Sequence, residues 1–310
     1  RKGDVLVSNI RPYFKKIWQA KYDGGCSNDV LVFTPNPMTD KDFLYYVLAN
    51  DEFFLYSMAT SKGTKMPRGD KDSIMQYEIP DIGLDRQRKI ASVLKSLDDK
   101  IQLNIAINKN LEQQAEALYK KYFAPVDSEM QNIKTLDIFC NIFTGKKNSN
   151  AATPDGKFKF FTCSPEPLQI DSFIFDGNAI IVSGNGVYTG RTRFYSGKFD
   201  LYQRTYACTL KEGFHSDYIF PLYWFVKLEL SKKIMGGTRG SAIPYIVMND
   251  LAKFEFECDQ NKFETYMPLF KSITEGIQAN ENQNETLAQL RDTLLPQLMS
   301  SELDVFAIDI

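Results

Sequence analysis

Apolar residues recur in a three-and-four spacing along two long segments of this 310-residue chain, from about Arg86 to Phe123 and from about Lys262 to Met299. In the first segment the recurring positions are Ile90, Leu94, Leu97, Ile101, Asn104, Asn108, Leu111, Ala115, Leu118 and Tyr122. In the second they follow one by one at a single constant offset, at Tyr266, Phe270, Ile273, Ile277, Asn280, Asn284, Leu287, Arg291, Leu294 and Leu298. Such spacing over several heptads is typical of a helix packed lengthwise against another helix. Two matched copies predict that these two helices pair with each other.

Both segments carry two asparagines at the same two positions of this seam, Asn104 and Asn108 in the first and Asn280 and Asn284 in the second. A polar residue at a helix seam costs stability but fixes the register and orientation of the partner helix. We therefore expect the asparagines to meet across an antiparallel pair, the alternative being exposure on the backs of the helices. A slip of one helical turn would displace one helix by about 5 Å.

The repeat extends beyond the two helices. Gly3–Ser8 aligns with Gly177–Ser183, Ser27–Val32 corresponds to Gln203–Cys208, and Gly63-Thr64 precedes Gly237-Thr238 by nearly the same offset. Runs rich in branched and aromatic residues predict strands at Val5–Ser8, Val30–Phe33, Phe158–Phe161, Ala179–Val182 and Arg204–Leu210, with short helices near 43–60 and 219–235. The predicted fold class is α+β. It has two β-rich domains separated by two long helices packed as an antiparallel coiled coil, in a pseudo-two-fold repeat.

This organisation predicts six segments. They are a first β-rich domain (1–80), a first helix (81–123), a linker (124–132), a second β-rich domain (133–259), a second helix (260–303) and a tail (304–310). The halves differ in length, because the whole stretch 133–176 precedes the Gly177 strand whereas only Arg1 and Lys2 precede Gly3. We expect from this difference that the first domain is N-terminally truncated.

Charge is unevenly distributed, although the formal net charge is only −2. Residues 133–250 hold 14 Lys and Arg against 10 Asp and Glu, whereas residues 260–310 hold 3 against 8. A local basic face can bind phosphates whatever the total charge is, although a solvated surface is the alternative. No apolar run approaches the length of a membrane span and the N-terminus does not resemble a signal peptide, so we expect a cytoplasmic protein.

Residues for catalysis or metal binding are not found in any convincing arrangement. The five cysteines form no CxxC pair, and the single histidine, His215, lies in a segment that resembles a loop. The loop Gly184–Gly190 follows a predicted strand but has neither the G-x-G-x-x-G spacing nor a Walker lysine, so we expect a tight turn at a DNA-facing edge. The acidic pair Asp98-Asp99 is expected on a helix exterior, where solvation or a contact with a partner accounts for it. The sequence therefore predicts neither an enzyme nor a metal site.

Residues suited to DNA contact are more frequent. Glycines let a backbone approach a surface closely, lysines neutralise phosphates, and an arginine can pair bidentately with guanine. Ordinary glycine turns and solvated faces are the alternatives. The candidates gather in two glycine-threonine loops, in clusters beside the Asn185–Gly190 loop and its counterpart in the first half, and in one lysine pair. They are Lys62, Gly63, Thr64, Lys65, Arg68; Gly237, Thr238, Arg239, Ser241; Tyr188, Arg191, Arg193, Gln203, Arg204; Arg11, Tyr13, Lys15, Lys16; and Lys146, Lys147.

Two stretches resemble the conserved regions of type I restriction-modification specificity subunits. The first runs from Ile79-Pro80 through Leu84-Asp85-Arg86-Gln87-Arg88-Lys89-Ile90-Ala91 to Ile101, and the second is Gln289–Leu303. Both glycine-threonine loops also fit the target-recognition domains of that family. The chain departs from the pattern at its start and at Thr144-Gly145-Lys146-Lys147, where a Gly-Gly-Thr-Pro-like turn is usual.

The resemblance implies a non-catalytic subunit in which each target-recognition domain binds one half of a split site on double-stranded DNA. The helices would set the spacer and dock two methylation subunits, which carry the S-adenosylmethionine chemistry and connect to restriction subunits. No cofactor is implied for this chain itself. The alternatives are a half-reader or inactive scaffold remnant from a rearranged specificity gene, and a stand-alone enzyme with its own recognition domain.

Overall fold

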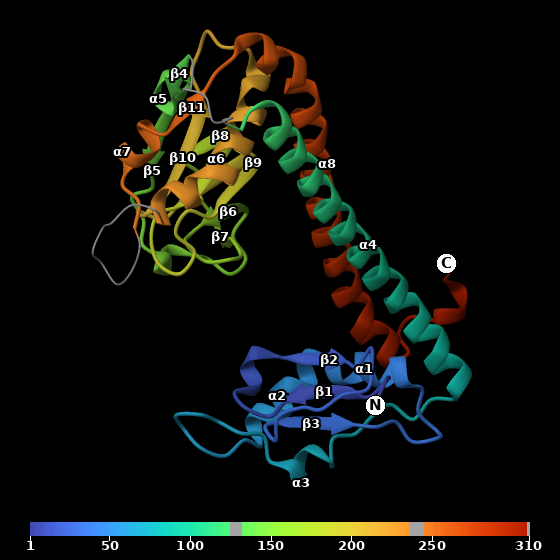
Figure 1. Cartoon of the computed structure of the whole chain (residues 1–310). Coiled ribbons are helices and arrows are strands. Elements are labelled where there is room, and N and C mark those ends of the chain that lie inside the picture. Colours follow the sequence, from blue (N-terminus) through green and yellow to red (C-terminus); the bar gives the residue numbers. More distant parts are fainter. Residues whose placement is uncertain (125–131, 236–244, 309–310) are drawn as a thin grey trace. The chain divides into compact units, whose positions relative to one another are not determined.

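The computed structural model describes residues 1–124, 132–235 and 245–308, and it divides the chain into two compact units. One unit contains residues 1–105 and 282–310, and the other contains residues 106–281. Each unit therefore combines one globular domain with the adjoining parts of both long helices, α4 (Leu84–Tyr122) and α8 (Gln260–Met299). The α+β fold class and the paired long helices are confirmed (Figure 1).

The two helices pack antiparallel along the predicted seam. In the first unit, Ile90, Leu94, Leu295 and Leu298 share one buried cluster. In the second, the ring of Tyr122 stacks on that of Tyr266 at 4.1 Å between centroids. None of the predicted seam residues is exposed. The heptad pattern thus identified the buried stripe of both helices.

The four asparagines meet across the pair as predicted. In the first unit, Asn104 Nδ2 donates to Asn284 Oδ1 at 2.9 Å and to Gln283 Oε1 at 2.7 Å. In the second, Asn280 Nδ2 donates to Asn108 Oδ1 at 2.7 Å. Asn104 is only 1% exposed, so exposure on the back of the helix is wrong for this residue.

We predict that Asn104→Leu lowers the free energy of unfolding by about 1–3 kcal/mol, because it leaves the amides of Asn284 and Gln283 without their seam partner. Adding Asn284→Leu should recover much of this loss, since two leucines can pack at the seam. Thermal melts of the single and double variants measure the coupling. Asn282→Leu, at an exposed position of α8, is the matched control. Additive losses in the double variant would contradict a paired layer.

The first globular domain contains a three-stranded antiparallel sheet. Its order is β2 (Ile17–Gln19), β1 (Val5–Ser8), β3 (Val30–Phe33). Helices α1 (Lys41–Ala49), α2 (Asp51–Ala59) and α3 (Lys71–Ile74) follow β3. The sequence predicts one helix near 43–60. The structure has two, because Asn50 adopts an extended backbone and its side chain caps α2 by accepting from the amide of Glu52.

The second globular domain contains a six-stranded sheet. Its order is β5 (Cys140–Thr144), β10 (Thr205–Leu210), β8 (Phe175–Ser183), β9 (Thr192–Leu201), β6 (Phe158–Phe161), β7 (Leu168–Ile170). Around it lie α5 (Leu136–Phe139), α6 (Ile219–Met235) and α7 (Met248–Ala252), with β4 (Ile133–Thr135) paired to β11 (Glu255–Glu257). The central order β10-β8-β9 repeats β3-β1-β2, with antiparallel pairing throughout both triplets. The internal repeat predicted from sequence is therefore a repeat of topology.

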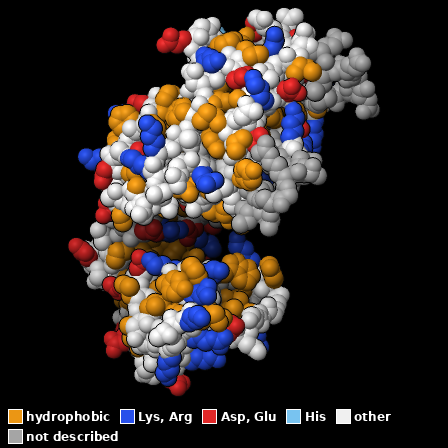
Figure 2. Space-filling view, turned by 90° about the vertical axis from the view of Figure 1, so that its left-hand side faces the viewer, with side chains coloured by type: hydrophobic (Ala, Val, Ile, Leu, Met, Phe, Trp, Pro, Cys, Tyr) orange, Lys and Arg blue, Asp and Glu red, His pale blue; other side chains and the backbone are white. Residues whose placement is uncertain are grey.

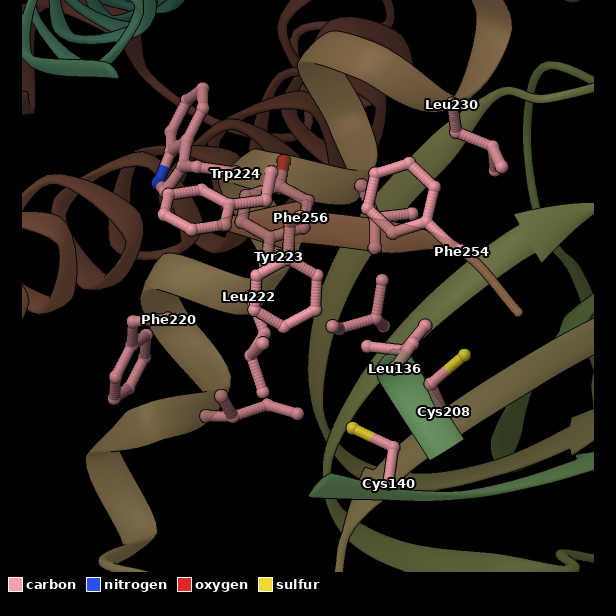
Figure 3. Close-up of a cluster of buried hydrophobic side chains, with 14 of the residues drawn as sticks. Leu136, Cys140, Cys208, Phe220, Leu222, Tyr223, Trp224, Leu230, Phe254 and Phe256 are labelled. Atoms are coloured by element: carbon pink, nitrogen blue, oxygen red, sulfur yellow. The ribbon is translucent and has the colours of Figure 1, made fainter. Parts of the chain in front are cut away.

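The second half of strand β8, residues 179–183, is buried on both faces, and its side chains alternate between two cores. Ile180 and Val182 join the large cluster that contains α6 and Trp224, whereas Ala179 and Ile181 join a cluster with Phe199 and Leu201 of β9. Figure 3 shows part of the large cluster, where Cys140 and Cys208 lie beside Leu136. The sheet is thus covered on both sides within the second unit.

These two buried cysteines should be inert toward thiol reagents in the folded protein. Burial raises the pKa of the Cys140 thiol to about 12 and that of Cys208 well above its ordinary value. At pH 8 a thiol with that pKa is ionised in about one molecule in 10,000. We expect exposed Cys26 to react first with Ellman's reagent, and Cys140 and Cys208 only after unfolding. Cys26→Ser should remove the fast phase, and rapid labelling of Cys140 would contradict the packing.

Each helix within residues 1–124, 132–235 and 245–308 is too short or too polar to span a lipid bilayer.

Candidate nucleic-acid interface

Two loops of the first globular domain are joined by backbone hydrogen bonds at one end of its sheet. The hairpin loop between β1 and β2 (residues 9–16) meets the loop between α2 and α3 (residues 60–70). Arg11 N donates to Pro67 O at 2.8 Å, and Gly69 N donates to Asn9 O at 3.1 Å. We call these two segments the first loop cluster. It brings together the candidates from both segments, which are far apart in the sequence.

The glycine-threonine segment forms a small hairpin within this cluster. Lys62 N donates to Arg68 O at 2.9 Å, and Arg68 N donates back to Lys62 O at 3.0 Å. Gly63 has a φ of 93°, which an L side chain rarely adopts and glycine tolerates. Thr64 and Lys65 at the turn are exposed. The hairpin therefore exposes the Thr64 hydroxyl and the Lys65 ammonium to solvent, and the two hydrogen bonds between Lys62 and Arg68 hold its backbone.

Several cations of the first loop cluster are already paired with carboxylates. Lys15 Nζ lies 2.6 Å from Asp51, Arg68 lies 3.1 Å from Asp29, and Lys62 pairs with Asp70. The hydrogen bond from Lys62 is the main cause that lowers the pKa of Asp70 to about 2. Any anion that binds these cations must therefore compete with the protein's own carboxylates.

The remaining candidates of this cluster are placed differently. Arg11 has a left-handed backbone and a half-buried side chain, and its Nε atom has no hydrogen-bond partner among the described residues. Tyr13 is 48% exposed, and the Lys16 ammonium lies over the ring of Phe14. Lys65 forms no ion pair with any described residue. Tyr13, Lys16 and Lys65 are exposed and therefore available to a ligand, whereas the Nε atom of Arg11 is buried.

The second globular domain gathers its candidates at the matching place. The loop after β8 (184–191) and the turn before β10 (202–204) are joined by a hydrogen bond from Gly184 N to Arg204 O at 2.8 Å. Gln203 N in turn donates to Lys147 O at 2.9 Å, which adds the segment 144–148. We call these three segments the second loop cluster. Gly237, Thr238, Arg239 and Ser241 lie outside the described residues.

Cations of the second loop cluster are mostly free of carboxylates. The guanidinium of Arg191 stacks on the exposed ring of Tyr188 at 4.3 Å, and Arg204 and Lys146 are exposed. None of these three cations forms an ion pair within the described part of the chain. Arg193 is more enclosed, and burial followed by the charge of Arg191 lowers its pKa. Unpaired cations beside an aromatic ring suit an anionic, planar ligand.

Two residues that were predicted to contact DNA, Lys147 and Gln203, form bonds with other side chains of the protein. Lys147 Nζ lies 2.8 Å from buried Asp200, and it also bonds Ser172, which itself donates to Asp200. Gln203 Nε2 donates to Asn148 Oδ1 at 2.8 Å. Lys147 therefore anchors the segment 144–148, while Lys146 beside it faces solvent.

The structure adds residues that sequence analysis did not select. Val187 at the tip of the 184–191 loop is 94% exposed, and Cys163 Sγ donates to Arg204 O at 3.3 Å. Exposed Trp18 and Tyr22 lie in the first globular domain. Figure 2 shows lysine and arginine side chains interspersed with exposed hydrophobic ones on the face turned to the viewer. The only sequence signal for Val187 is that it is an apolar residue within a glycine-rich loop.

Potential metal ligands are dispersed over the described residues. Within residues 1–124, 132–235 and 245–308, no three His, Cys, Asp or Glu side chains are grouped so that they could hold a metal ion. His215 Nδ1 accepts a hydrogen bond from the amide of Asp217 at 3.3 Å, so its ring caps a short helical turn.

Comparison with known proteins supports this description. Residues 1–113 match the family described as the type I restriction modification DNA specificity domain. The chain is 39% identical over 180 residues to the type I restriction enzyme EcoDI specificity subunit of Escherichia coli, covering 55% of this chain and 38% of that protein. It is 35% identical over 135 residues to the HindI specificity subunit of Haemophilus influenzae, covering 41% and 29%. The chain thus spans less than half the length of these two curated relatives.

A solved structure shares the fold along most of the chain. It is the type I restriction-modification system S subunit from M. genitalium, with a TM-score of 0.59 and 15% identity. The match covers 96% of this chain and 83% of that one. The resemblance to type I specificity subunits is confirmed by these matches, and the matched residues 1–113 contain the first of the two stretches that suggested it, Ile79–Ile101. The chain is therefore similar in sequence to specificity subunits of type I restriction-modification systems, and it shares the fold of a solved S subunit.

Proposed function

We propose that this chain is a non-catalytic DNA-specificity subunit of a type I restriction-modification complex. Each globular domain, at residues 1–80 and 133–259, would bind one half of a bipartite site on double-stranded DNA. The observation that carries the proposal is the repeated triplet β2-β1-β3 and β9-β8-β10, with a loop cluster at the same end of each triplet. Two copies of one binding surface in a single chain suit a target in two parts.

The long helices would set the distance between the two half-sites and would form the docking surface for methylation subunits. Asn104, Asn108, Asn280 and Asn284 support the first role, because paired amides at the seam disfavour slippage. Two methylation subunits would supply the S-adenosylmethionine chemistry, and restriction subunits would join through them. We expect the complex to work in the cytoplasm, where the five free thiols would persist.

The direct test is to co-express the chain with a cognate methylation subunit and to map methylated adenines across the host genome by single-molecule sequencing. A split motif with a fixed spacer is the expected result. A symmetric motif would instead indicate a half-reader that acts as a dimer. If the complex forms but no motif appears, the chain is a scaffold and the proposed function is wrong.

A further inference from the structure

In each unit, one buried aromatic side chain of the globular domain forms a hydrogen bond to a long helix, and the two side chains occupy equivalent positions. The sequence Leu44-Tyr45-Tyr46-Val47 in α1 matches Leu222-Tyr223-Trp224-Phe225 in α6, at nearly the offset that relates the two long helices. Tyr46 is 4% exposed and Trp224 is fully buried. Each ring carries one polar group, which needs a partner once it is buried.

In the first unit that partner is a charged pair on the two helices. The hydroxyl of Tyr46 donates to Asp98 Oδ2 on α4 at 2.7 Å, and Arg291 Nη1 on α8 donates to Asp98 Oδ1 at 2.7 Å. Asp98 was expected on a helix exterior, and this is wrong because both of its oxygens accept bonds from other elements. Only Asp99 beside it is exposed. The charged junction thus joins the globular domain to both helices at once.

In the second unit the equivalent junction is neutral. Trp224 Nε1 donates to Thr274 Oγ1 on α8 at 2.9 Å, and this hydroxyl donates to Phe270 O at 2.7 Å (Figure 3 shows Trp224). In the helix repeat Thr274 is the counterpart of Asp98, and the counterpart of Arg291 is Ala115, which is fully buried. The repeat therefore places Tyr–Asp–Arg in one unit where it places Trp–Thr–Ala in the other.

We propose that these two junctions fix the orientation of each globular domain on the helix pair, and that Tyr46 and Trp224 are positioning residues for DNA specificity. The proposal rests on the proposed function. A hydrogen bond buried at the edge of a core restricts rotation more than apolar contact does, because apolar attraction has little directional preference. If the junction loosens, the loop cluster of that domain samples more orientations. The spacer between half-sites would then be less strictly defined.

The first experiment measures orientation in the full chain without DNA. Spin labels are placed at exposed Leu55 on α2 and exposed Lys100 on α4, after Cys26, Cys163 and Cys258 are replaced by serine. Tyr46→Phe should broaden the measured distance distribution. Tyr56→Phe is the matched control, because its hydroxyl donates to Ser73 O within the same globular domain. An unchanged width in Tyr46→Phe would overturn the proposal.

A rescue variant distinguishes a positioning role of Tyr46 from a mere loss of stability in the Tyr46→Phe variant. The triple variant Tyr46→Trp, Asp98→Thr, Arg291→Ala installs the neutral junction in the first unit and should narrow the distribution again, whereas Asp98→Thr alone should not. In the genome-wide methylation assay, Tyr46→Phe should raise methylation about tenfold at sites whose spacer is one base pair longer or shorter than that of the motif. About tenfold is the change in an equilibrium that corresponds to the loss of one hydrogen bond to a charged group. A strict spacer in that variant would also overturn the proposal. If the unaltered chain shows no split motif, the proposed function fails, and the distance measurement still decides the junction.

Discussion

Replacing Gly145 with alanine should lower the free energy of unfolding of the second unit by about 3 kcal/mol or more, the upper part of the range for overpacked sites. A Cβ built on Gly145 would lie 1.7 Å from Leu201 O and 2.3 Å from Leu201 C. Both are backbone atoms at the end of β9, so no side-chain rotation can relieve the overlap. Strand β9 must shift, and with it the ladder to β6, in which Phe161 pairs with Leu201.

Calorimetry of the full chain measures this effect, and hydrogen exchange locates it. Amides of β5, β9 and β10 should lose protection in Gly145→Ala, whereas those of β1 and β3 should not. Gly25→Ala is the matched control, since its Cβ would meet nothing within 4 Å. The interpretation of the 144–148 segment as a close-packed turn is wrong if the two alanine variants melt at the same temperature.

The sequence predicted the helix pair well because its signal is local and periodic. A heptad repeat places seam residues on one stripe whatever the rest of the chain does. Helix α8 runs through Pro268 and Pro296, which local propensity would treat as breaks. The seam pattern continues across both prolines and agrees with the structure. Packing along the partner helix therefore outweighs these local penalties.

The loop clusters were predictable only as separate segments. Arg204 and Lys147 were each selected for their chemistry, but their proximity to each other and to the loop that begins at Gly184 depends on the pairing of β5, β8 and β10. Such long-range pairing leaves no periodic signal in the sequence. The carboxylates that pair with Lys15 and Arg68 were missed for the same reason, because Asp51 and Asp29 lie elsewhere along the chain.

Buried polar junctions were the hardest feature to anticipate. Arg291 occupies a seam position and Asp98 was assigned to the exterior, so neither suggested a partner for Tyr46. An aspartate that accepts bonds from two other elements has the same sequence signature as a solvated one. The match between Leu44–Val47 and Leu222–Phe225 was visible in the sequence, but its meaning required the contacts of both rings.

Removing the unpaired cations of the second loop cluster should cause the largest loss of DNA binding. If each of Lys146, Arg191 and Arg204 contacts one phosphate, the variant Lys146→Gln, Arg191→Gln, Arg204→Gln loses three contacts. The slope of log K against log salt concentration should then become shallower by about 3, and affinity at about 0.15 M salt should fall about 100-fold. The measurement is fluorescence anisotropy of duplex DNA with the chain bound to its methylation subunit, over a range of salt concentrations.

The matched control removes the same charge from the same unit. Lys120, Lys232 and Lys253 are paired with Glu116, Glu229 and Asp137, at 2.6, 2.9 and 2.9 Å. Their replacement by glutamine should leave the salt slope nearly unchanged, because a cation held by a carboxylate releases few DNA counterions. Equal slopes in the two triple variants would mean that the total charge of the unit governs binding. The second loop cluster would then not be the surface that holds the phosphates.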